Sequence, residues 1–153
     1  MKLLMVCIGN ICRSPLAEGI LKDKLEKAGI NYFVDSAGII SYHVGEAPDY
    51  RSIEAAQRHG INISTQIARK FSAFDFEKFD LIFAMDNEVY DEIISFAQSS
   101  IHRKKINLFL EYAGYGFGSS VPDPYYGTKK DFENVFLLID AACEKIISKF
   151  QNK

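Results

Sequence analysis

A short apolar run at the start of the chain, followed at once by Cys7 and a loop that leads into Ser14-Pro15, most limits the possible folds. Lys2–Val6 is continuous and apolar, which is typical of a central parallel strand that is buried on both faces. Ser14-Pro15 opens a segment of helical spacing, and Ser14 is suited to cap it. The sequence therefore predicts a tight loop over residues 8–13 between a buried strand and a helix N-terminus.

The rest of the chain alternates predicted strands with predicted helices. We expect strands at residues 32–34, 80–85 and 106–110, and helices at residues 15–28, 49–59, 87–97 and 130–150, with Asp86 as an N-cap. Residues 71–79 read as a short helix or turns, and residues 39–48, 102–105 and 112–127 read as loops. This alternation predicts an α/β fold in one domain of residues 1–153, with a four-stranded parallel sheet flanked by helices on both faces.

Composition excludes several classes of function. A net charge of −2 and the shortness of the basic cluster at residues 102–105 give no basis for binding nucleic acid. No apolar run approaches the length of a membrane span, and the apolar start is too short for a secretory signal. Three cysteines without such a signal favour a reducing cytoplasm, in which a reactive thiol persists.

The loop after the first strand combines the features of a phosphate-binding site. The N–H groups of a loop that ends at a helix N-terminus point at one spot, and the helix dipole makes that spot positive. Such a setting favours the thiolate form of Cys7, and the guanidinium of Arg13 can clamp a phosphate through two hydrogen bonds. Gly9 is expected to allow a turn that other residues resist, and Asn10 to tolerate a positive φ. The sequence predicts a nucleophile inside a phosphate cradle.

Hydrolysis of phosphate monoesters fits this cradle. A thiolate attacks phosphorus, the alcohol leaves, and water then breaks the phosphocysteine. The N–H groups of residues 8–13 and the Arg13 guanidinium would hold the oxygens, and the Ser14 hydroxyl would stabilise the departing thiolate. Asp123, fixed between two prolines, is the candidate acid for the leaving oxygen, and the adjacent Tyr125-Tyr126 can wall a pocket around it.

The same residues resemble the low-molecular-weight protein tyrosine phosphatases. That family opens with Cys-x-Gly-Asn-Ile-Cys-Arg-Ser-Pro and then Ala-Glu, which this chain matches from Cys7 to Glu18. The family's late Asp-Pro-Tyr-Tyr-Gly loop is similar to residues 123–127. Shorter matches lie between them in the family's order, at residues 35–38, 43–45, 59–61, 68–69 and 79–80. The resemblance covers nearly the whole chain.

The resemblance implies a role for each matching residue. Cys7 is implied as the nucleophile, Arg13 as the phosphate binder and Asp123 as the general acid. The implied substrate contacts come from the loop and the cleft walls: Ile8, Gly9, Asn10, Ile11, Cys12, Ser14, Tyr42 and Tyr125. Asn10 and Ser36 are implied to hold the shape of the loop, and Cys12 to form a reversible disulfide with Cys7.

The resemblance also implies that neither a metal nor another cofactor is needed. We expect a phosphotyrosine-containing protein or a small aryl phosphate as substrate, inorganic phosphate as product, and a monomer or weak dimer. The chain departs from the family at three places. Tyr42 stands where tryptophan is common, Tyr50 stands where proline is common, and Thr65-Gln66-Ile67 lacks the histidine that supports the loop asparagine. These departures bear on substrate preference and loop support rather than on the reaction.

Three other functions remain open from the sequence. Arsenate reduction on the same scaffold needs relay cysteines, and Cys143, on the apolar face of the last predicted helix, reads as core. A phosphocysteine phosphate-carrier domain has no need for Arg13 together with Asp123. A silent phosphotyrosine-binding module needs no nucleophile. Glu18 reads as a charge in the first helical turn, and the three histidines show no metal-ligand spacing.

Overall fold

A parallel sheet of four strands, in the order β2–β1–β3–β4, forms the centre of the computed structural model, which describes residues 1–152. The strands are β1 (Lys2–Cys7), β2 (Phe33–Gly38), β3 (Leu81–Ala84) and β4 (Ile106–Leu108). β1 pairs in parallel with β2 on one side and with β3 on the other. The strand order therefore reverses at β1, so the loop after β1 lies at the switch point where open α/β sheets bind ligands.

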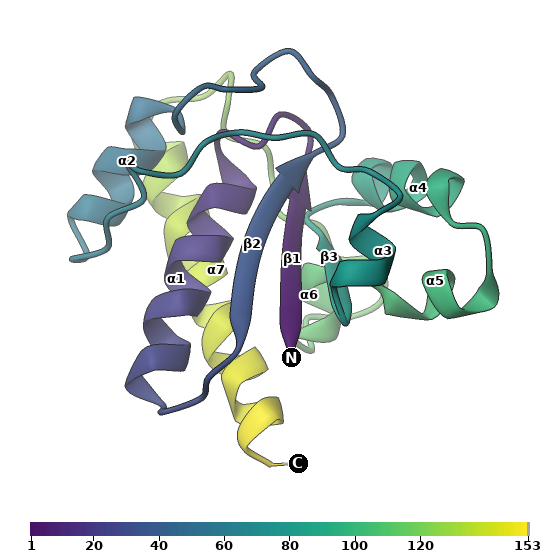
Figure 1. Cartoon of the computed structure of the whole chain (residues 1–153). Helices are drawn as coiled ribbons and strands as arrows, with labels where there is room; N and C mark the ends of the chain where they lie inside the picture. Colours follow the sequence, from purple (N-terminus) through teal and green to yellow (C-terminus); the bar gives the residue numbers. More distant parts are fainter. Residues whose placement is uncertain (153) are drawn as a thin grey trace.

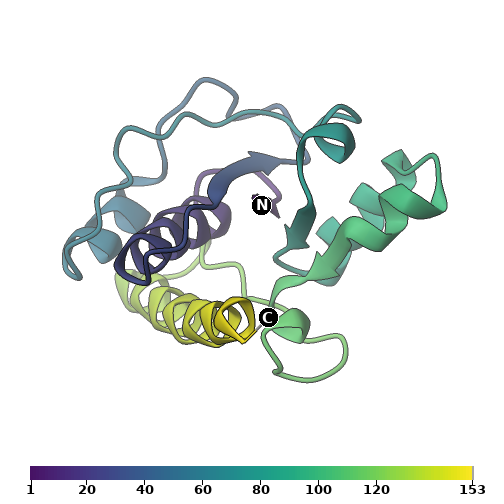
Figure 2. The same cartoon turned by 60° about the horizontal axis from the view of Figure 1, so that its bottom comes forward.

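Helices cover both faces of this sheet, which confirms the predicted fold class (Figures 1 and 2). On one face, α1 and α7 pack side by side, with α2 against them. On the other face lie α3 and α4, with α5 beyond them. The helices are α1 (Arg13–Lys27), α2 (Tyr50–Gln57), α3 (Asp75–Lys78), α4 (Asn87–Phe96), α5 (Ser100–Lys105), α6 (Phe109–Tyr112) and α7 (Lys129–Gln151).

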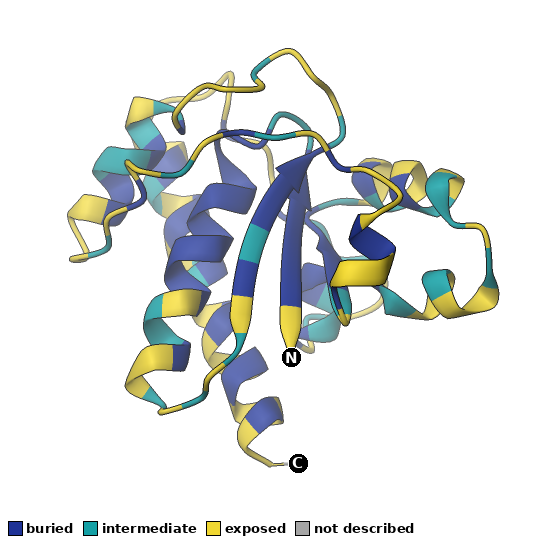
Figure 3. Cartoon of the chain, viewed as in Figure 1, coloured by how far each residue is buried: buried dark blue, intermediate teal, exposed yellow. Residues whose placement is uncertain are grey.

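After the exposed Lys2, the first strand is apolar and buried because it contributes to both layers of the core (Figure 3). Leu3 and Met5 pack with α1 and α7, whereas Leu4 and Val6 face the opposite layer with α4. All four side chains are 0% exposed. Burial of a leucine or methionine of this kind contributes about 1.5–3 kcal/mol, so β1 is firmly fixed and its carboxyl end is a rigid base for the loop that follows.

The prediction of a strand over residues 106–110 is wrong at its end. β4 stops at Leu108, and Phe109–Tyr112 form the single-turn helix α6. The rings of Phe109 and Tyr112 both pack edge-on against Phe83, with centroids 6.1 and 5.0 Å away. A helical turn brings these two aromatic residues onto one face of the core, which an extended strand with alternating side chains does not do.

Two other element predictions need correction, and one is confirmed. Residues 102–105 belong to α5 rather than to a loop, because the Ser99 side chain caps that helix and the His102 ring stacks on Phe76 at 4.5 Å. β2 continues to Gly38, beyond the predicted residues 32–34. Asp86 caps α4 as predicted, since its carboxylate accepts the Val89 N–H at 2.8 Å.

Within residues 1–152, none of the helices combines the length and apolar character needed to cross a bilayer.

Candidate active site

A pocket of about 410 Å³ opens at the carboxyl end of the sheet. The loops after β1 and β2 and the segment before α7 meet there, at the upper end of the molecule in Figure 1. Twelve residues line the pocket: Cys7, Ile8, Gly9, Ile11, Cys12, Arg13, Ile40, Tyr42, His43, Asp123, Tyr125 and Tyr126. The structure thus brings the predicted nucleophile, phosphate binder and acid to one cavity, although more than a hundred residues of sequence separate the first from the last.

Cys7 lies at the end of β1, with its sulfur against the start of α1. Its Sγ is 2.9 Å from the Ser14 hydroxyl. The Ser14 oxygen also accepts a hydrogen bond from the Asn10 side-chain amide at 2.8 Å. Since that oxygen already accepts from Asn10, its own proton is free to donate to the sulfur, an arrangement that stabilises a thiolate.

Ser14 does not cap α1, contrary to the sequence-based expectation. The helix begins at Arg13, with Cys12 at the N-cap position and no side-chain cap. Among residues 1–152, no protein acceptor is found for the backbone N–H groups of Ile8 through Arg13. Five of these residues, Ile8, Gly9, Ile11, Cys12 and Arg13, line the pocket together with Cys7. Backbone N–H groups at the N-terminus of a helix form anion-binding sites in proteins.

Two acceptors outside the loop hold the Arg13 guanidinium. Its Nη1 donates to Asp86 Oδ2 at 2.7 Å and to the Val121 carbonyl at 2.9 Å. Burial alone would lower the pKa of this guanidinium, but the facing Cys7 and the carboxylates of Asp86 and Asp123 raise it above its ordinary value. Arg13 is therefore a buried, permanently charged group whose other nitrogens remain directed at the pocket.

The shape of the loop depends on Asn10. It is the one non-glycine residue among residues 1–152 with a positive φ, 57°. Its amide nitrogen donates to the hydroxyls of Ser14 and Ser36, at 2.8 and 2.9 Å, and its Oδ1 accepts the Arg69 backbone N–H at 3.1 Å. Both amide protons and the amide oxygen of the side chain are hydrogen-bonded, so the strained backbone conformation is fixed by its neighbours.

Glu18 extends this network, and it lies beyond the first turn of α1, contrary to the sequence-based expectation. It is 4% exposed and accepts the Ser36 hydroxyl proton at 2.7 Å. Its other oxygen accepts from Lys22 at 2.6 Å. A buried carboxylate is stable only when paired in this way. The run from Glu18 through Ser36 and Asn10 to Ser14 ends at the Cys7 sulfur and connects it to α1 and β2.

At Gly9 and Gly38 a side chain would come too close to neighbouring atoms of the site. Gly9 does not adopt a positive φ, so the predicted conformational role is wrong; a Cβ there would approach the His43 ring at 3.0 Å. Gly38, at the end of β2, was not predicted to matter. A Cβ on it would lie 2.8 Å from the Ile8 carbonyl and 2.9 Å from the Asn10 nitrogen. Because these neighbours are backbone atoms, only glycine fits beneath the loop.

Asp123 faces the loop from the opposite wall of the pocket. Its Oδ2 is 3.8 Å from Arg13 Nη2, and its Oδ1 accepts the Tyr125 backbone N–H at 3.1 Å. The preceding Val121 is buried and donates its N–H to the carbonyl of Met85, after β3. The carboxylate side chain remains 41% exposed, so it reaches both the pocket and solvent and can exchange protons with water.

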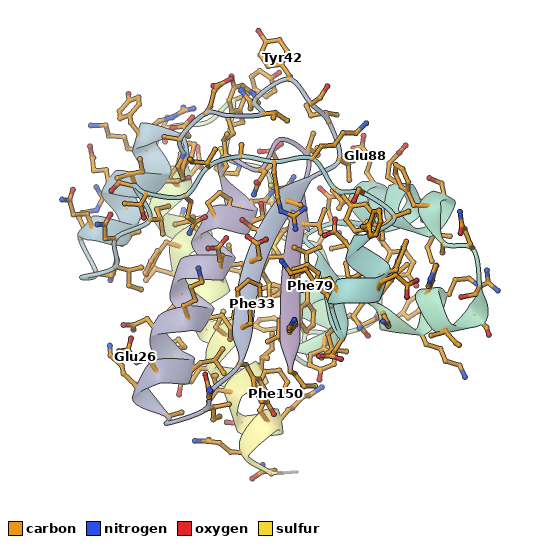
Figure 4. All side chains as sticks on the ribbon, viewed as in Figure 1. Glu26, Phe33, Tyr42, Phe79, Glu88 and Phe150 are labelled. Carbon is orange, nitrogen blue, oxygen red and sulfur yellow. The ribbon has the colours of Figure 1, made fainter. Side chains whose placement is uncertain are left out.

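Aromatic side chains form the outer walls of the pocket. The rings of Tyr125 and Tyr126 meet edge-on at 5.0 Å, and His43 lies 4.8 Å from the Tyr42 ring and 6.3 Å from the Tyr125 ring. Tyr42 is 81% exposed and stands at the rim (Figure 4). A flat aromatic group that enters between these walls would carry an attached phosphate to the loop.

Two of the predicted substrate contacts do not line the pocket. Asn10 and Ser14 lie beneath the loop, where their side chains support it. Ile40 and His43 do line the pocket and were not among the predicted contacts, whereas Tyr126 lines it as a predicted wall. Within the described residues, no group of three histidine, cysteine, aspartate or glutamate side chains has an arrangement that holds a metal ion.

Gln66 occupies the position where the resemblance leads one to expect a histidine. Its Nε2 donates to the Pro15 carbonyl at 3.1 Å, and its buried Oε1 has no partner within residues 1–152. No hydrogen bond joins it to Asn10 in that part of the chain. The Arg69 backbone and the pair of Ser36 and Glu18 support the asparagine here instead.

Asp86 is the functional candidate that sequence reasoning missed. It was predicted only as a helix cap, yet the same carboxylate caps α4 and anchors Arg13. One available signal was its position two residues after a buried strand that adjoins β1. The carboxyl ends of neighbouring parallel strands meet at the same edge of a sheet, so a polar residue there lies near the site.

Comparisons with known proteins agree with this geometry. Residues 2–153 match the family model described as low molecular weight phosphotyrosine protein phosphatase. The chain is 41% identical to the low molecular weight phosphotyrosine protein phosphatase of Schizosaccharomyces pombe, over 91% of this chain and 90% of that one. It is 37% identical to the human protein of the same name, over 95% and 93%.

A solved structure has the same fold. The protein tyrosine phosphatase of Entamoeba histolytica, crystallised with Hepes in the active site, superposes with a TM-score of 0.92 at 38% identity, covering 99% of this chain and 97% of that one. The match of the family model over nearly the whole sequence, together with relatives of this identity and coverage, shows that the chain belongs to the low molecular weight phosphotyrosine protein phosphatase family.

Proposed function

We propose that this chain hydrolyses aryl phosphate monoesters, with phosphotyrosine-containing proteins as its substrates, through a phosphocysteine intermediate. One observation carries the proposal. The Cys7 sulfur lies 2.9 Å from the Ser14 hydroxyl, next to loop N–H groups that have no acceptor within residues 1–152, in the pocket that Arg13 and Asp123 also line. A nucleophile, an anion cradle and a proton donor are what the reaction requires.

In the first step the Cys7 thiolate attacks phosphorus and the bond from phosphorus to the aryl oxygen breaks. Asp123 gives its proton to the departing oxygen, which leaves as the phenol. The N–H groups of residues 8–13 and the Arg13 guanidinium hold the three remaining phosphoryl oxygens. Because they are fixed before the substrate arrives, little reorganisation is needed as charge develops.

In the second step water attacks phosphorus and the sulfur–phosphorus bond breaks. The Asp123 carboxylate accepts a proton from that water, and inorganic phosphate is released. The Ser14 hydroxyl donates to the sulfur as negative charge returns to it, which makes Cys7 a better leaving group. Every group in this cycle returns to its starting protonation state.

The aromatic walls favour a phenyl ester over an alkyl one. Tyr125 and Tyr126 line the pocket on the side of the acid, and Tyr42 lies at the rim. A phosphotyrosine side chain is long enough to place its phosphate in the loop while its ring contacts these walls, whereas phosphoserine is shorter and has no ring.

Turnover of p-nitrophenyl phosphate, with acid quenching to trap a phosphorylated protein, tests this function. We expect label on Cys7 during turnover, and we expect Cys7→Ser to abolish turnover while still binding inorganic phosphate. Activity of the serine variant near that of the wild type, or label on another residue, would refute the nucleophile. A matched Cys143→Ser variant should keep full activity, because Cys143 is 0% exposed within the helical layer.

The alternative functions have less support. Arsenate reduction needs a relay thiol, and burial raises the pKa of Cys143, which lies in the core cluster formed with α1 and α7. A phosphate carrier passes its phosphoryl group to a partner protein, so an acid facing the phosphate-binding arginine serves no purpose in it. A carrier would give one burst of p-nitrophenol without further turnover.

Oxidative protection of the site is a separate proposal, which rests on the family resemblance and on the position of Cys12. Both Cys7 and Cys12 line the same pocket, and burial raises the pKa of the Cys12 thiol, so that Cys12 stays protonated and unreactive while Cys7 works. Peroxide would oxidise the Cys7 thiolate to a sulfenic acid, and the Cys12 thiol would then displace water to form a disulfide. A reducing cytoplasm would restore the thiols.

A further inference from the structure

The first turn of α2 lies between the two loops that form the site. On one side, the Asp49 N–H donates to the Ile11 carbonyl at 2.8 Å, within the loop after β1. On the other side, Arg51 donates from Nη2 to the Tyr125 carbonyl at 3.0 Å and from Nη1 to the Gly127 carbonyl at 3.3 Å. Asp49 and Arg51 therefore connect the phosphate-binding loop to the loop that carries Asp123.

The Arg51 side chain is already fixed where it contacts the loop of residues 121–127, which carries Asp123 and is named the acid loop. Asp49 accepts from its Nε at 3.0 Å and from its Nη2 at 2.9 Å, which is a bidentate pair, and also accepts the Arg51 backbone N–H at 2.9 Å. The guanidinium stacks over the Phe132 ring of α7, 4.3 Å from its centroid. Paired and stacked arginines lose little further entropy when they form additional hydrogen bonds.

Asp49 and Arg51 both remain charged around neutral pH. Burial would raise the pKa of the Asp49 carboxyl, but the hydrogen bonds from Arg51 outweigh it and lower that pKa below its ordinary value. The side chains are only 10% and 20% exposed, for Asp49 and Arg51 respectively. A bidentate, largely buried ion pair of this kind holds the Arg51 guanidinium in one orientation, unlike a flexible ion pair on the surface.

Beyond Asp123, the acid loop is anchored by the buried Pro124 and by the Gly127 N–H, which donates to the Pro124 carbonyl at 2.8 Å. Tyr126 is 94% exposed and Tyr125 is 36% exposed, so side-chain packing holds these two residues only weakly. Tyr125 uses its N–H to hold Asp123 Oδ1 at 3.1 Å, and uses its carbonyl to accept from Arg51. The same residue thus joins the acid to the arginine.

We propose that Arg51 is a positioning residue that fixes the Asp123 carboxyl for proton transfer by holding the backbone of Tyr125 and Gly127. The inference rests on the proposed function, since Asp123 must act as the acid for its position to matter. Arg51 does not line the pocket and touches no reacting atom. Its loss should therefore affect leaving-group protonation and leave phosphate binding intact.

The test compares Arg51→Met, Arg51→Lys and a matched control, Arg58→Met. Methionine keeps the apolar contact with Phe132 and removes the donors, whereas lysine keeps a charge and one donor. Arg58 is on the same helical segment and pairs with Glu54 and Glu133, away from the acid loop. Each protein is assayed for kcat/KM with p-nitrophenyl phosphate and phenyl phosphate, and for inhibition by inorganic phosphate.

For Arg51→Met we expect kcat/KM with phenyl phosphate to fall about tenfold more than with p-nitrophenyl phosphate, because the poorer leaving group depends on the acid. Phosphate inhibition should stay within about twofold, which also reports a folded site, and lysine should recover part of the loss. Arg58→Met should leave the ratio between substrates unchanged. In an Asp123→Asn background, Arg51→Met should cause no further loss for phenyl phosphate.

Equal losses for the two esters would overturn the proposal, as would a loss in the Asp123→Asn background as large as in the wild type. Weakened phosphate inhibition with an unchanged substrate ratio would also overturn it, because it would place the effect of Arg51 at the phosphate loop. Failure of the proposed function gives a different result, since the wild-type protein would then turn over neither ester.

Discussion

Asp86 and Arg13 form a buried ion pair, with Oδ2 and Nη1 2.7 Å apart, that links the start of α4 to the start of α1. Their side chains are 17% and 2% exposed. The pair leaves the second nitrogen of Arg13 to face the pocket, where Asp123 lies 3.8 Å away. A phosphate that enters the loop therefore meets a guanidinium whose orientation is already set.

Asp86→Asn should weaken phosphate binding and lower kcat/KM by about tenfold, because the neutral amide no longer holds the charged guanidinium. Asparagine still caps α4, so helix formation is retained. Inhibition by inorganic phosphate measures the first effect. Asp86→Ala is the companion variant and should be less stable than the asparagine variant by about 1 kcal/mol, from loss of the cap. Unchanged phosphate affinity in Asp86→Asn would show that Arg13 needs no such anchor.

Asp123→Asn should slow phosphoenzyme formation by about 10²–10⁴-fold for poor leaving groups and much less for p-nitrophenol, since a good leaving group needs no proton. A series of aryl phosphates that spans a range of phenol acidity measures this dependence. The slope of log kcat/KM against leaving-group pKa should be steeper in the variant. A uniform loss across the series would instead assign Asp123 a role in binding or in shaping the loop.

Asn10→Ala and Asn10→Gly separate backbone strain from hydrogen bonding. Both lose the side-chain bonds to Ser14 and Ser36, but glycine adopts the φ of 57° without strain. Alanine should therefore be less stable than glycine by about 1–2 kcal/mol, as measured by urea denaturation. Both variants should turn over more slowly than the wild type, because Ser14 is no longer held against Cys7. Equal stability of the two variants would argue that φ at residue 10 does not limit the fold.

Cys12→Ser should recover less activity than the wild type after brief exposure to hydrogen peroxide and treatment with a thiol reductant. Without Cys12, the sulfenic acid on Cys7 proceeds to irreversible oxidation. The expected gap is severalfold in recovered activity and grows with peroxide dose. The wild type should also show a Cys7–Cys12 disulfide by mass spectrometry of peptides. If both proteins recover equally, Cys12 has only a packing role.

Glu133 gives a pH dependence of stability outside the active site. Burial would raise its pKa, but hydrogen bonds from His59 and Arg58 lower it below the ordinary 4.5. A carboxyl whose folded pKa is lowered stabilises the fold above its unfolded pKa, and this stability is lost as pH falls through the folded value. Melting temperatures should fall more steeply below about pH 4.5 in the wild type than in Glu133→Gln. Parallel curves for the two proteins would remove this link between α2 and α7.

Much of the site was predictable because its parts are adjacent in the sequence. Cys7 ends β1, Asn10 lies in the loop that follows and Arg13 begins α1, so the strand and the helix fix the direction of the loop between them. A continuous apolar strand can be buried only between two layers, so residues 2–6 determined that the loop sits at the centre of the sheet. The positive φ at Asn10 follows from its short polar side chain for the same local reason.

The predictions failed where a contact between distant segments outweighed local preference. Phe109 and Tyr112 lie in a helical turn because both rings pack on Phe83, although a strand was predicted to reach residue 110. Residues 102–105 were predicted as a loop, but they are helical and the His102 ring stacks on Phe76. Glu18 reads from the sequence as a charge in the first helical turn, whereas in the structure it is buried beside Ser36 of β2. Each of these depends on which side chain faces which neighbour across the sheet, and sequence spacing does not contain that information.

The amino-acid sequence by itself pointed to the nucleophile and the phosphate cradle that we propose, and to the alternation of strands and helices, because these depend on neighbouring residues and on hydrophobic periodicity. Only the tertiary structure decided which groups hold the machinery in place: Asp86 against Arg13, Glu18 and Ser36 beneath Asn10, and Arg51 against the backbone of the acid loop. Those partners come from separate elements, and long-range packing of the two layers on the sheet is what brings their charges within hydrogen-bonding distance.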